Sequence, residues 1–440
     1  MTVDPTPRGL LVAAASSHSG KTTVTIGLIA ALRELGLSVA AAKCGPDYLD
    51  PRFLEAASGG VAINVDPWAM GPDRVRVRLA AHAAATDILV VEGVMGLFDG
   101  GAHGAGSTAE LARITGLPVL LVVSAQGMAQ SAAAIAEGFA RMADGIRIVG
   151  AVVNGVGSER HARLIREGFA RASVPLVGLV RRDPGVALPS RHLGLVQAEE
   201  HVDLASRVAL AGRLVADGCD LDSIIGSADR ILPAARAEAS AGRLVPLGQR
   251  VAVARDRAFG FAYPHLLSDW RGQGAEIRFF SPLADEPPDA EADAVFLPGG
   301  YPELHGGTLA AADRFRAGMG AAAGRGALIY GECGGYMSLG ESLIDAEGRE
   351  HRMLGLLPLS TSFARRKLHL GYRRLMPLAD LPWPSELRGH EFHYATILRE
   401  GDAERLFAAE TSDGEDLGAM GLRRGRVMGS FAHVIDAAPL

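Results

Sequence analysis

The strongest constraint on this chain is a repeated alternation of short apolar runs with alanine-rich helical patterns. Six apolar runs in the first half have the length of buried strands, and they are residues 9–15, 37–43, 87–93, 118–125, 147–154 and 175–180. Helical patterns separate most of these runs, which predicts a doubly wound, mostly parallel sheet. A parallel strand is buried on both faces, so an uninterrupted apolar run suits it.

A second series of the same kind begins near residue 249. Its strand candidates lie within residues 251–256, 276–283, 293–304 and 327–337. The stretch before it, from about residue 225, is rich in Ala, Arg and Glu and is interpreted as a helix plus a linker. We therefore predict an α/β protein with two doubly wound, mostly parallel sheets, in a domain over residues 1–233, a linker over 234–248 and a domain over 249–440.

Composition excludes several classes of protein. The 440 residues are 48% hydrophobic and 21% charged, and the net charge of −6 argues against a general attraction to nucleic acid. Cys44, Cys219 and Cys333 are far apart and form no disulfide framework. The N-terminus lacks the pattern of a signal peptide, and the apolar runs are too short to cross a bilayer. We expect a cytoplasmic protein without nucleic-acid or membrane partners, and a homodimer remains open.

The segment SGKTT follows the first predicted strand and opens a helix. Unpaired N–H groups and the helix dipole make such a junction an anion site. Gly20 lets the backbone approach phosphates, Lys21 supplies charge, and the Thr22 hydroxyl suits Mg²⁺. We predict an ATP site here, formed by Ser19, Gly20, Lys21, Thr22 and Thr23.

This loop departs from the common P-loop pattern. Ala15 stands where G-x-x-x-x-G-K-[ST] requires a glycine, which indicates a variant loop of the kind seen in dethiobiotin synthetase-like ATPases. Asn154 ends another predicted strand, where it is either a contact for a purine edge or an ordinary turn residue.

Charged side chains follow two further strands of the first predicted sheet. Lys43, Asp47 and Asp50 lie in a turn shaped by Pro and Gly, and Glu92 ends the next apolar strand, with Asp99 a weaker candidate. Ligands bind at the carboxyl ends of parallel strands. We therefore assign Lys43 to the nucleotide, and Asp47 and Glu92 to the magnesium site beside Thr22. Turn-forming aspartates in a polar surface loop explain the first turn equally well.

The segment ALIYGECGGYM is the most informative part of the second half. An apolar strand runs into a turn in which glycines flank Cys333 on both sides, the pattern of a nucleophile elbow. A position at a helix N-terminus predicts a lowered pKa for the thiol. Backbone N–H groups near Gly299 and Gly300, together with that of Gly334, offer an oxyanion hole. The alternative is a buried, inert thiol.

A cysteine nucleophile also requires a base. His390 and His393 lie in GHEFHY, and His433 follows an apolar strand-like run that would hold it rigidly. Two histidines three residues apart favour a structural or substrate-contact role. A metal site is disfavoured there because no third ligand follows at metal-site spacing.

Taken together, these motifs resemble a known family. G-x-C-x-G, PGGYPE and the late SFAH resemble the class I glutamine amidotransferase domain. With SGKTT, GPDYLDP, EGVMGLFDG and RHLGLV, nearly the whole chain resembles the cobyrinic or hydrogenobyrinic acid a,c-diamide synthases. The resemblance implies that one domain releases ammonia from L-glutamine. It also implies that an ATPase domain activates the a and c carboxylates of a corrin-ring precursor as acyl phosphates, which ammonia converts to amides.

The resemblance also implies residue roles. Cys333 is the nucleophile and His433 its base, Lys21 and Thr22 hold ATP and Mg²⁺, and Asp47 and Glu92 match acidic positions of the ATPase domain. Tyr48 and Asp50 lie near the corrinoid carboxylate. The chain departs from the class I pattern because Val434 and Ile435, not a glutamate, follow the histidine. The third member of the triad is therefore unassigned.

Two other interpretations stay open. The first is a cobyric acid synthase, which amidates other side chains of the same ring. The second is a partitioning-type switch ATPase, which leaves the Cys333 elbow without purpose and expects a basic amphipathic tail that this C-terminus lacks. A polycarboxylate substrate also needs cations, and the candidates are Arg365, Arg366, Lys367, Arg373 and Arg374, although a solvated basic strand explains most of them.

Overall fold

The computed structural model describes residues 6–191, 194–195, 197–231, 243–383 and 386–439. It divides the chain into two compact units, Met1–Ala241 and Gly242–Leu440. Most of the predicted linker, and His192, Leu193 and Val196 of the RHLGLV motif, lie outside the described residues. Among the residues that are described, no helix is both long enough and apolar enough to cross a membrane.

The first unit contains a sheet with the strand order β3-β2-β4-β1-β5-β6-β7. All neighbours in this order are parallel. The strands are β1 (Arg8–Ala14), β2 (Val39–Cys44), β3 (Ala62–Val65), β4 (Ile88–Glu92), β5 (Val119–Ser124), β6 (Ile148–Val156) and β7 (Leu176–Arg181). The short β10 (Asp229–Arg230) pairs antiparallel with β1, and β8 (Ser190–Arg191) pairs with β9 (Gly194–Leu195).

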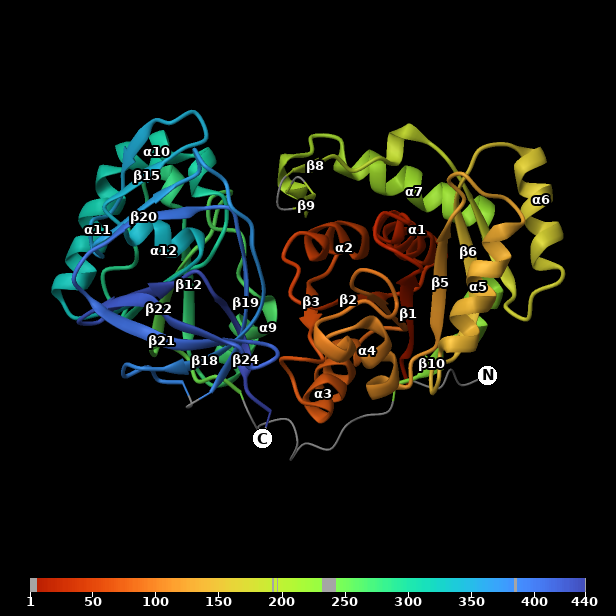
Figure 1. Ribbon diagram of the computed structural model, residues 1–440, viewed down its shortest axis with the longest axis horizontal. Helices are drawn as coiled ribbons and strands as arrows, with labels where there is room; N and C mark the ends of the chain where they lie inside the picture. The colour runs from red at the N-terminus through yellow and green to blue at the C-terminus, as the bar shows by residue number, and fades with distance from the viewer. Residues whose placement is uncertain (1–5, 192–193, 196, 232–242, 384–385, 440) are drawn as a thin grey trace. The chain divides into compact units, whose positions relative to one another are not determined.

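Helices follow the strands in the predicted alternation. They are α1 (Lys21–Glu34), α2 (Asp50–Ser58), α3 (Pro72–Ala83), α4 (Thr108–Thr115), α5 (Ser131–Met142), α6 (Glu159–Phe169), α7 (Leu204–Gly218) and α8 (Leu221–Ser227). In Figure 1, α1 packs with α2 and α7, whereas α3 lies with α4 and α5 with α6. The predicted α/β fold class is confirmed.

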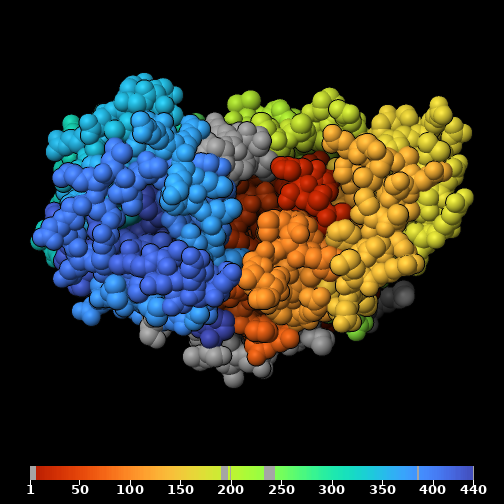
Figure 2. Space-filling view, in the orientation of Figure 1, coloured from red at the N-terminus to blue at the C-terminus, as the bar shows by residue number. Residues whose placement is uncertain are grey.

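The centre of this first sheet is deeply buried. Six of the seven β1 residues are buried, and Leu11 and Val12 are fully inaccessible. Little of the red N-terminal segment reaches the surface in Figure 2, where orange and yellow segments border it. β3 was not predicted, because it has only four residues and includes the polar Asn64.

The second unit contains a ten-stranded sheet with the order β12-β11-β13-β14-β23-β22-β21-β18-β19-β24. Its parallel part comprises β11 (Arg250–Ala254), β12 (Glu276–Phe280), β13 (Ala294–Leu297), β14 (Leu328–Glu332) and β23 (Val427–Ser430). The antiparallel part adds β18 (His369–Pro377), β19 (Leu387–His393), β21 (Glu404–Thr411), β22 (Asp416–Arg424) and β24 (His433–Ala437). The helices are α9 (Pro264–Gly272), α10 (Gly306–Ala311), α11 (Asp313–Gly324) and α12 (Gly334–Leu339).

The antiparallel strands were not anticipated from the sequence. β22, for example, exposes most of its residues, so it carries no continuous apolar run. A smaller sheet, in the order β16-β15-β17-β20, is formed by β16 (Glu350–Arg352), β15 (Ser342–Ile344), β17 (Leu359–Ser362) and β20 (Thr396–Glu400). The antiparallel extension matters for the site, because it brings β19 and β24 together.

Candidate active sites

The SGKTT loop lies between the end of β1 and the start of α1. Gly20 precedes α1 with φ 83°, a left-handed conformation that favours glycine. The Asn154 side-chain amide, from β6, donates to the Ser19 carbonyl at 3.1 Å. Asn154 therefore braces the loop from β6, which β5 separates from β1 in the sheet, and its suggested contact with a purine stays a prediction.

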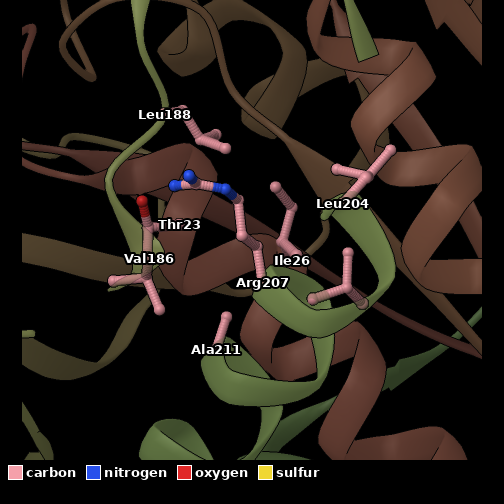
Figure 3. Close-up of a pocket in the computed structure, with 8 residues that line it drawn as sticks. Thr23, Ile26, Val186, Leu188, Leu204, Arg207 and Ala211 are labelled. Carbon is pink, nitrogen blue, oxygen red and sulfur yellow. The ribbon is translucent and has the colours of Figure 1, made fainter. Parts of the chain in front are cut away.

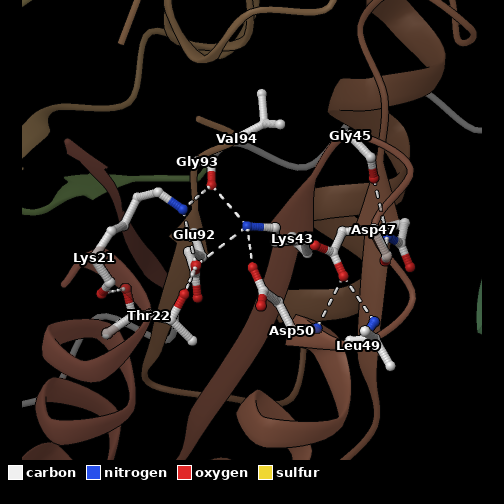
Figure 4. A network of polar contacts seen from close by, with 12 residues as sticks. Lys21, Thr22, Lys43, Gly45, Asp47, Leu49, Asp50, Glu92, Gly93 and Val94 are labelled. Atoms are coloured by element: carbon white, nitrogen blue, oxygen red, sulfur yellow. Dashed lines mark hydrogen bonds and ion pairs between the residues drawn. The ribbon is translucent and has the colours of Figure 1, made fainter. Parts of the chain in front are cut away.

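Glu92 at the end of β4 is the centre of a buried polar network (Figure 4). Its Oε1 accepts from Lys21 Nζ at 2.9 Å, from the Thr22 hydroxyl at 2.7 Å and from Lys43 Nζ at 3.1 Å. Both lysines also donate to the Gly93 carbonyl, at 2.6 and 2.9 Å. The structure thus brings together four side chains that the sequence analysis assigned to the nucleotide and magnesium site.

Charge in this network is largely compensated. Burial alone would raise the pKa of Glu92, but Lys21 and Lys43 lower it to about 2. Burial lowers the pKa of Lys21, whereas the attraction of Asp50 and Glu92 outweighs burial at Lys43 and raises its pKa. Lys43 Nζ lies 2.7 Å from Asp50 Oδ2, and burial and the neighbouring Asp47 raise the pKa of Asp50 to about 7. Lys43 and Glu92 therefore remain charged.

The predicted turn after β2 has a clear structural task. Asp47 Oδ1 accepts from the backbone N–H groups of Leu49 and Asp50, at 2.7 and 3.0 Å, and so fixes the entry into α2. Asn64 of β3 donates to the Asp47 carbonyl at 2.7 Å. The turn explanation therefore accounts for one oxygen of Asp47. Its role as a metal ligand, and the roles of Tyr48 and Asp50 toward a corrinoid, stay predictions.

The site suits a nucleotide with a divalent cation. Glu92 Oε2 is buried and has no hydrogen-bond partner among the described residues. An unsatisfied carboxylate oxygen beside a threonine hydroxyl is a donor set that Mg²⁺ accepts. Thr22 and Glu92 would hold the cation, and Lys21 would hold phosphate oxygens.

A small pocket adjoins the first turns of α1. It is lined by Thr23, Ile26, Val186, Leu188, Leu204, Arg207, Val208 and Ala211. Figure 3 shows that its walls are mostly aliphatic and that the Thr23 hydroxyl and the Arg207 guanidinium are its polar groups. Arg207 pairs with Asp203 at 2.9 Å, which fixes its position. Thr23 faces this pocket, and its predicted role at the nucleotide is untested.

In the second unit, Cys333 occupies the predicted elbow between β14 and α12. It has φ 47° and ψ −104°, a strained conformation for a residue other than glycine. The flanking glycines are sterically required: a Cβ on Gly335 would lie 1.9 Å from the Leu297 carbonyl oxygen, and one on Gly334 would lie 2.9 Å from Gly300 N. The backbones of Gly300 and Gly334, the predicted oxyanion hole, are therefore in contact.

His433 is the histidine that faces the elbow. A Cβ on Gly299 would lie 2.9 Å from His433 Nε2 and 3.3 Å from Cys333 Cβ, so both side chains crowd against this glycine. The other ring nitrogen, Nδ1, lies 3.6 Å from Glu332 Oε2. His433 is 1% exposed and begins β24, whose register with β19 places it opposite His390.

The predicted pKa of the thiol is wrong in direction. Burial raises the pKa of Cys333, and the nearby Glu303 raises it further, while the backbone N–H of Gly334 opposes them only weakly. Burial and the neighbouring His390 and His393 lower the pKa of His433 to about 3. The resting pair is therefore a thiol beside a neutral imidazole, which requires proton transfer before attack.

GHEFHY contributes a buried ion network on β19. His393 Nε2 lies 2.8 Å from Glu391 Oε1, and Arg373 of β18 bonds Glu391 Oε2 at 2.7 Å. Burial, and to a smaller extent the positive charge of Arg373, lowers the pKa of His390 to about 3. Arg373 is thus neither solvated nor open to a substrate carboxylate, unlike both explanations drawn from the sequence.

A third possible metal ligand does lie beside this network. His369, opposite His393 on β18, joins Glu391 and His393 so that their donor atoms lie within 4.8 Å of one another. The spacing argument missed it because it comes from the neighbouring strand. The rings of His369 and His393 are stacked with an angle of 7° between their planes, so the lone pairs of their nitrogens do not point to a common metal position. Arg373 also forms an ion pair with the carboxylate of Glu391. The cluster is better explained as an ion network.

The two units together define a class of protein. Residues 10–196 match the CobQ/CobB/MinD/ParA nucleotide binding domain, and residues 250–439 match the CobB/CobQ-like glutamine amidotransferase domain. The chain is therefore an amide-forming ligase that combines a nucleotide-binding domain with a glutamine amidotransferase domain.

Full-length relatives narrow this class. A hydrogenobyrinate a,c-diamide synthase of Rhizobium meliloti (strain 1021) is 54% identical over 428 residues, which cover 97% of this chain and 99% of the relative. Relatives of the same name from Sinorhizobium sp and Mesorhizobium japonicum are 55% and 49% identical, and each match covers 98% of this chain and 99% of the relative. The chain belongs to the hydrogenobyrinate a,c-diamide synthase family, which confirms the resemblance.

Proposed function

We propose that this protein uses ATP and L-glutamine to convert the a and c side-chain carboxylates of hydrogenobyrinate, a metal-free corrin ring, to amides. The substrate is taken from the names of the relatives. The observation that carries the proposal is the Cys333 elbow, because a strained, buried cysteine and a neutral histidine that pack against the same glycine, Gly299, are the arrangement of a cysteine glutaminase. A partitioning-type ATPase has no use for it.

In the glutaminase reaction, His433 Nε2 takes the proton from Cys333 Sγ and the thiolate attacks the amide carbon of glutamine. The N–H groups of Gly300 and Gly334 stabilise the developing oxyanion. The imidazolium returns the proton to the departing nitrogen, so ammonia leaves and a thioester remains. Water then hydrolyses the thioester to glutamate, with His433 again as the base.

In the first unit, ATP supplies the phosphoryl group that gives a carboxylate a better leaving group. The protein's part is to hold and orient: Lys21 neutralises phosphate charge, and Thr22 and Glu92 position Mg²⁺. Lys43 and Asp50 lie at the same sheet edge, where we propose that they meet the nucleotide and the corrinoid. The Mg²⁺ requirement and the cytoplasmic location also belong to this proposal.

Two variants test it. Cys333→Ser should abolish glutamine-dependent amidation but retain activity with high free ammonia, because the thiol serves only glutamine hydrolysis. Lys21→Ala should lower amidation by orders of magnitude with either nitrogen source, because carboxylate activation precedes nitrogen attack. The assay compares hydrogenobyrinate with the cobalt-containing ring. Equal loss of both activities in Cys333→Ser, or normal ammonia-dependent turnover in Lys21→Ala, would contradict the proposal, and exclusive use of the cobalt ring would correct the substrate.

A further inference from the structure

Glu332 is a buried carboxylate for which the glutaminase chemistry above has no role. It ends β14 directly before Cys333, and it is 2% exposed. Its Oε1 accepts from the backbone N–H of Val434 at 3.0 Å, so this oxygen is fixed by β24. Its other oxygen, Oε2, faces His433 Nδ1 at 3.6 Å.

We propose that Glu332 is the positioning residue that holds His433 in its catalytic orientation and tautomer, and so completes the triad left unassigned by the sequence. The inference rests on the proposed glutaminase function. An acceptor at Nδ1 keeps a proton on that nitrogen, which leaves the Nε2 lone pair toward Cys333. The imidazole ring of His433 thus lies between Glu332, at its Nδ1 edge, and Gly299, which is beside Cys333, at its Nε2 edge.

The distance of 3.6 Å is within ion-pair range but longer than a hydrogen bond. It should tighten when Cys333 transfers its proton to Nε2, because the imidazolium then donates from Nδ1 to a carboxylate, and such charged bonds are typically about 2.8 Å long. Stabilisation that appears only as the imidazolium forms lowers the barrier rather than the energy of bound glutamine.

The neighbouring carboxylate on β19 is not an alternative. Glu391 is already bonded to His393 and Arg373, and it contributes only charge near His433. The titratable groups that face the Glu332–His433 pair are Tyr330 and Cys333 near β14, and His390, His393 and Glu391 on β19.

The decisive variant is Glu332→Gln, measured as glutaminase activity of the full-length protein. Glutamine keeps the side-chain volume and an oxygen for Val434, but it replaces the acceptor at Nδ1 with an NH₂ group. We expect kcat to fall by roughly 10²-fold or more while KM for glutamine and ammonia-dependent amidation stay unchanged. Burial raises the pKa of Glu332 to about 8, and only the ionised carboxylate can stabilise the imidazolium. Wild-type kcat should therefore rise as the pH passes through 8, and the kcat of Glu332→Gln should not show this rise.

A double-mutant cycle separates positioning from packing. In a His433→Asn background, Glu332→Gln should add almost no further loss, because it acts through the imidazole. The matched control is Asp345→Asn, which removes another carboxylate–histidine pair of this unit, the buried Asp345 with the partly buried His351 at 2.8 Å. It should leave kcat unchanged.

Three results would overturn the proposal. They are a kcat of Glu332→Gln equal to that of the wild type, losses of kcat that add in the double-mutant cycle, and a loss of kcat in Asp345→Asn as large as in Glu332→Gln. Activity of Cys333→Ser with glutamine would instead overturn the glutaminase itself, so the two failures are distinguishable. If Glu332→Gln does not fold, the imidazole ¹⁵N resonances of His433 in wild-type protein, assigned by their loss in His433→Asn, decide. A protonated Nδ1 with an unprotonated Nε2 supports the proposal, and the opposite tautomer contradicts it.

Discussion

Single residues in this protein have properties set by burial more than by sequence neighbours. Cys333 precedes a helix, yet burial raises the pKa of its thiol, and His433 is held neutral by the same exclusion of water. Glu92 shows the opposite outcome, because two lysines compensate it and its pKa falls to about 2. The proposed catalytic pair therefore starts uncharged, while the proposed cation site starts as a charged network.

The residue-scale prediction concerns the base. His433→Asn should slow alkylation of Cys333 by iodoacetamide at neutral pH by roughly 10²-fold, because the thiol loses its proton acceptor. Matched changes, His390→Asn and His393→Asn, should have much smaller effects, because His433 is the histidine that packs against Gly299 beside Cys333. Rates are compared as a function of pH. A larger effect at either β19 histidine would assign the base differently.

At the scale of elements, both sites lie where a strand passes into a helix. The SGKTT loop joins β1 to α1, and the elbow joins β14 to α12. Neither junction is complete alone. Asn154 of β6 braces the first, and β24 supplies the histidine of the second. These junctions depend on glycine at positions where the backbone is left-handed or where another backbone approaches.

Gly20→Ala tests the first junction. Its Cβ would lie 2.0 Å from Asn154 Nδ2, so the brace must move, and the left-handed backbone adds strain of about 1–2 kcal/mol. We expect KM for ATP to rise about tenfold or more, with glutaminase activity unchanged. Gly36→Ala is the matched control, with φ 85° and nothing within 4 Å of the added Cβ. It should lose similar stability but keep its KM, and equal KM values in the two variants would refute the bracing role.

At the scale of the whole molecule, each unit surrounds its candidate site with its own buried core. The parallel sheet of the first unit gathers Lys21, Lys43 and Glu92 at one edge, and the mixed sheet of the second gathers Cys333, Glu332 and His433. Burying ionisable groups links the stability of the fold to pH, because the unfolded chain titrates with ordinary pKa values.

His390 gives a measurable case of this linkage. Its pKa is about 3 in the folded protein and 6.5 ordinarily, so below pH 6.5 the unfolded chain binds a proton that the folded chain does not. Stability from a neutral His390 is therefore present above pH 6.5 and lost as pH falls, by up to about 1.4 kcal/mol per pH unit. Relative to His390→Gln, wild-type protein should lose unfolding free energy between pH 7 and about pH 4 in urea titrations. A constant difference across this range would contradict a neutral buried His390.

The sequence by itself determined the α/β class, the SGKTT loop and the Cys333 elbow. Each of them depends on a local pattern in which an apolar strand, a glycine-containing turn and the start of a helix follow one another along the chain. Only the tertiary structure decided which distant groups meet. The contacts of Glu92 with Lys43, of Asn154 with Ser19 and of Glu332 with His433 depend on how the strands are arranged in each sheet, and no local pattern encodes that arrangement. The direction of the Cys333 pKa shift was decided in the same way, because burial is a property of the whole core around the thiol.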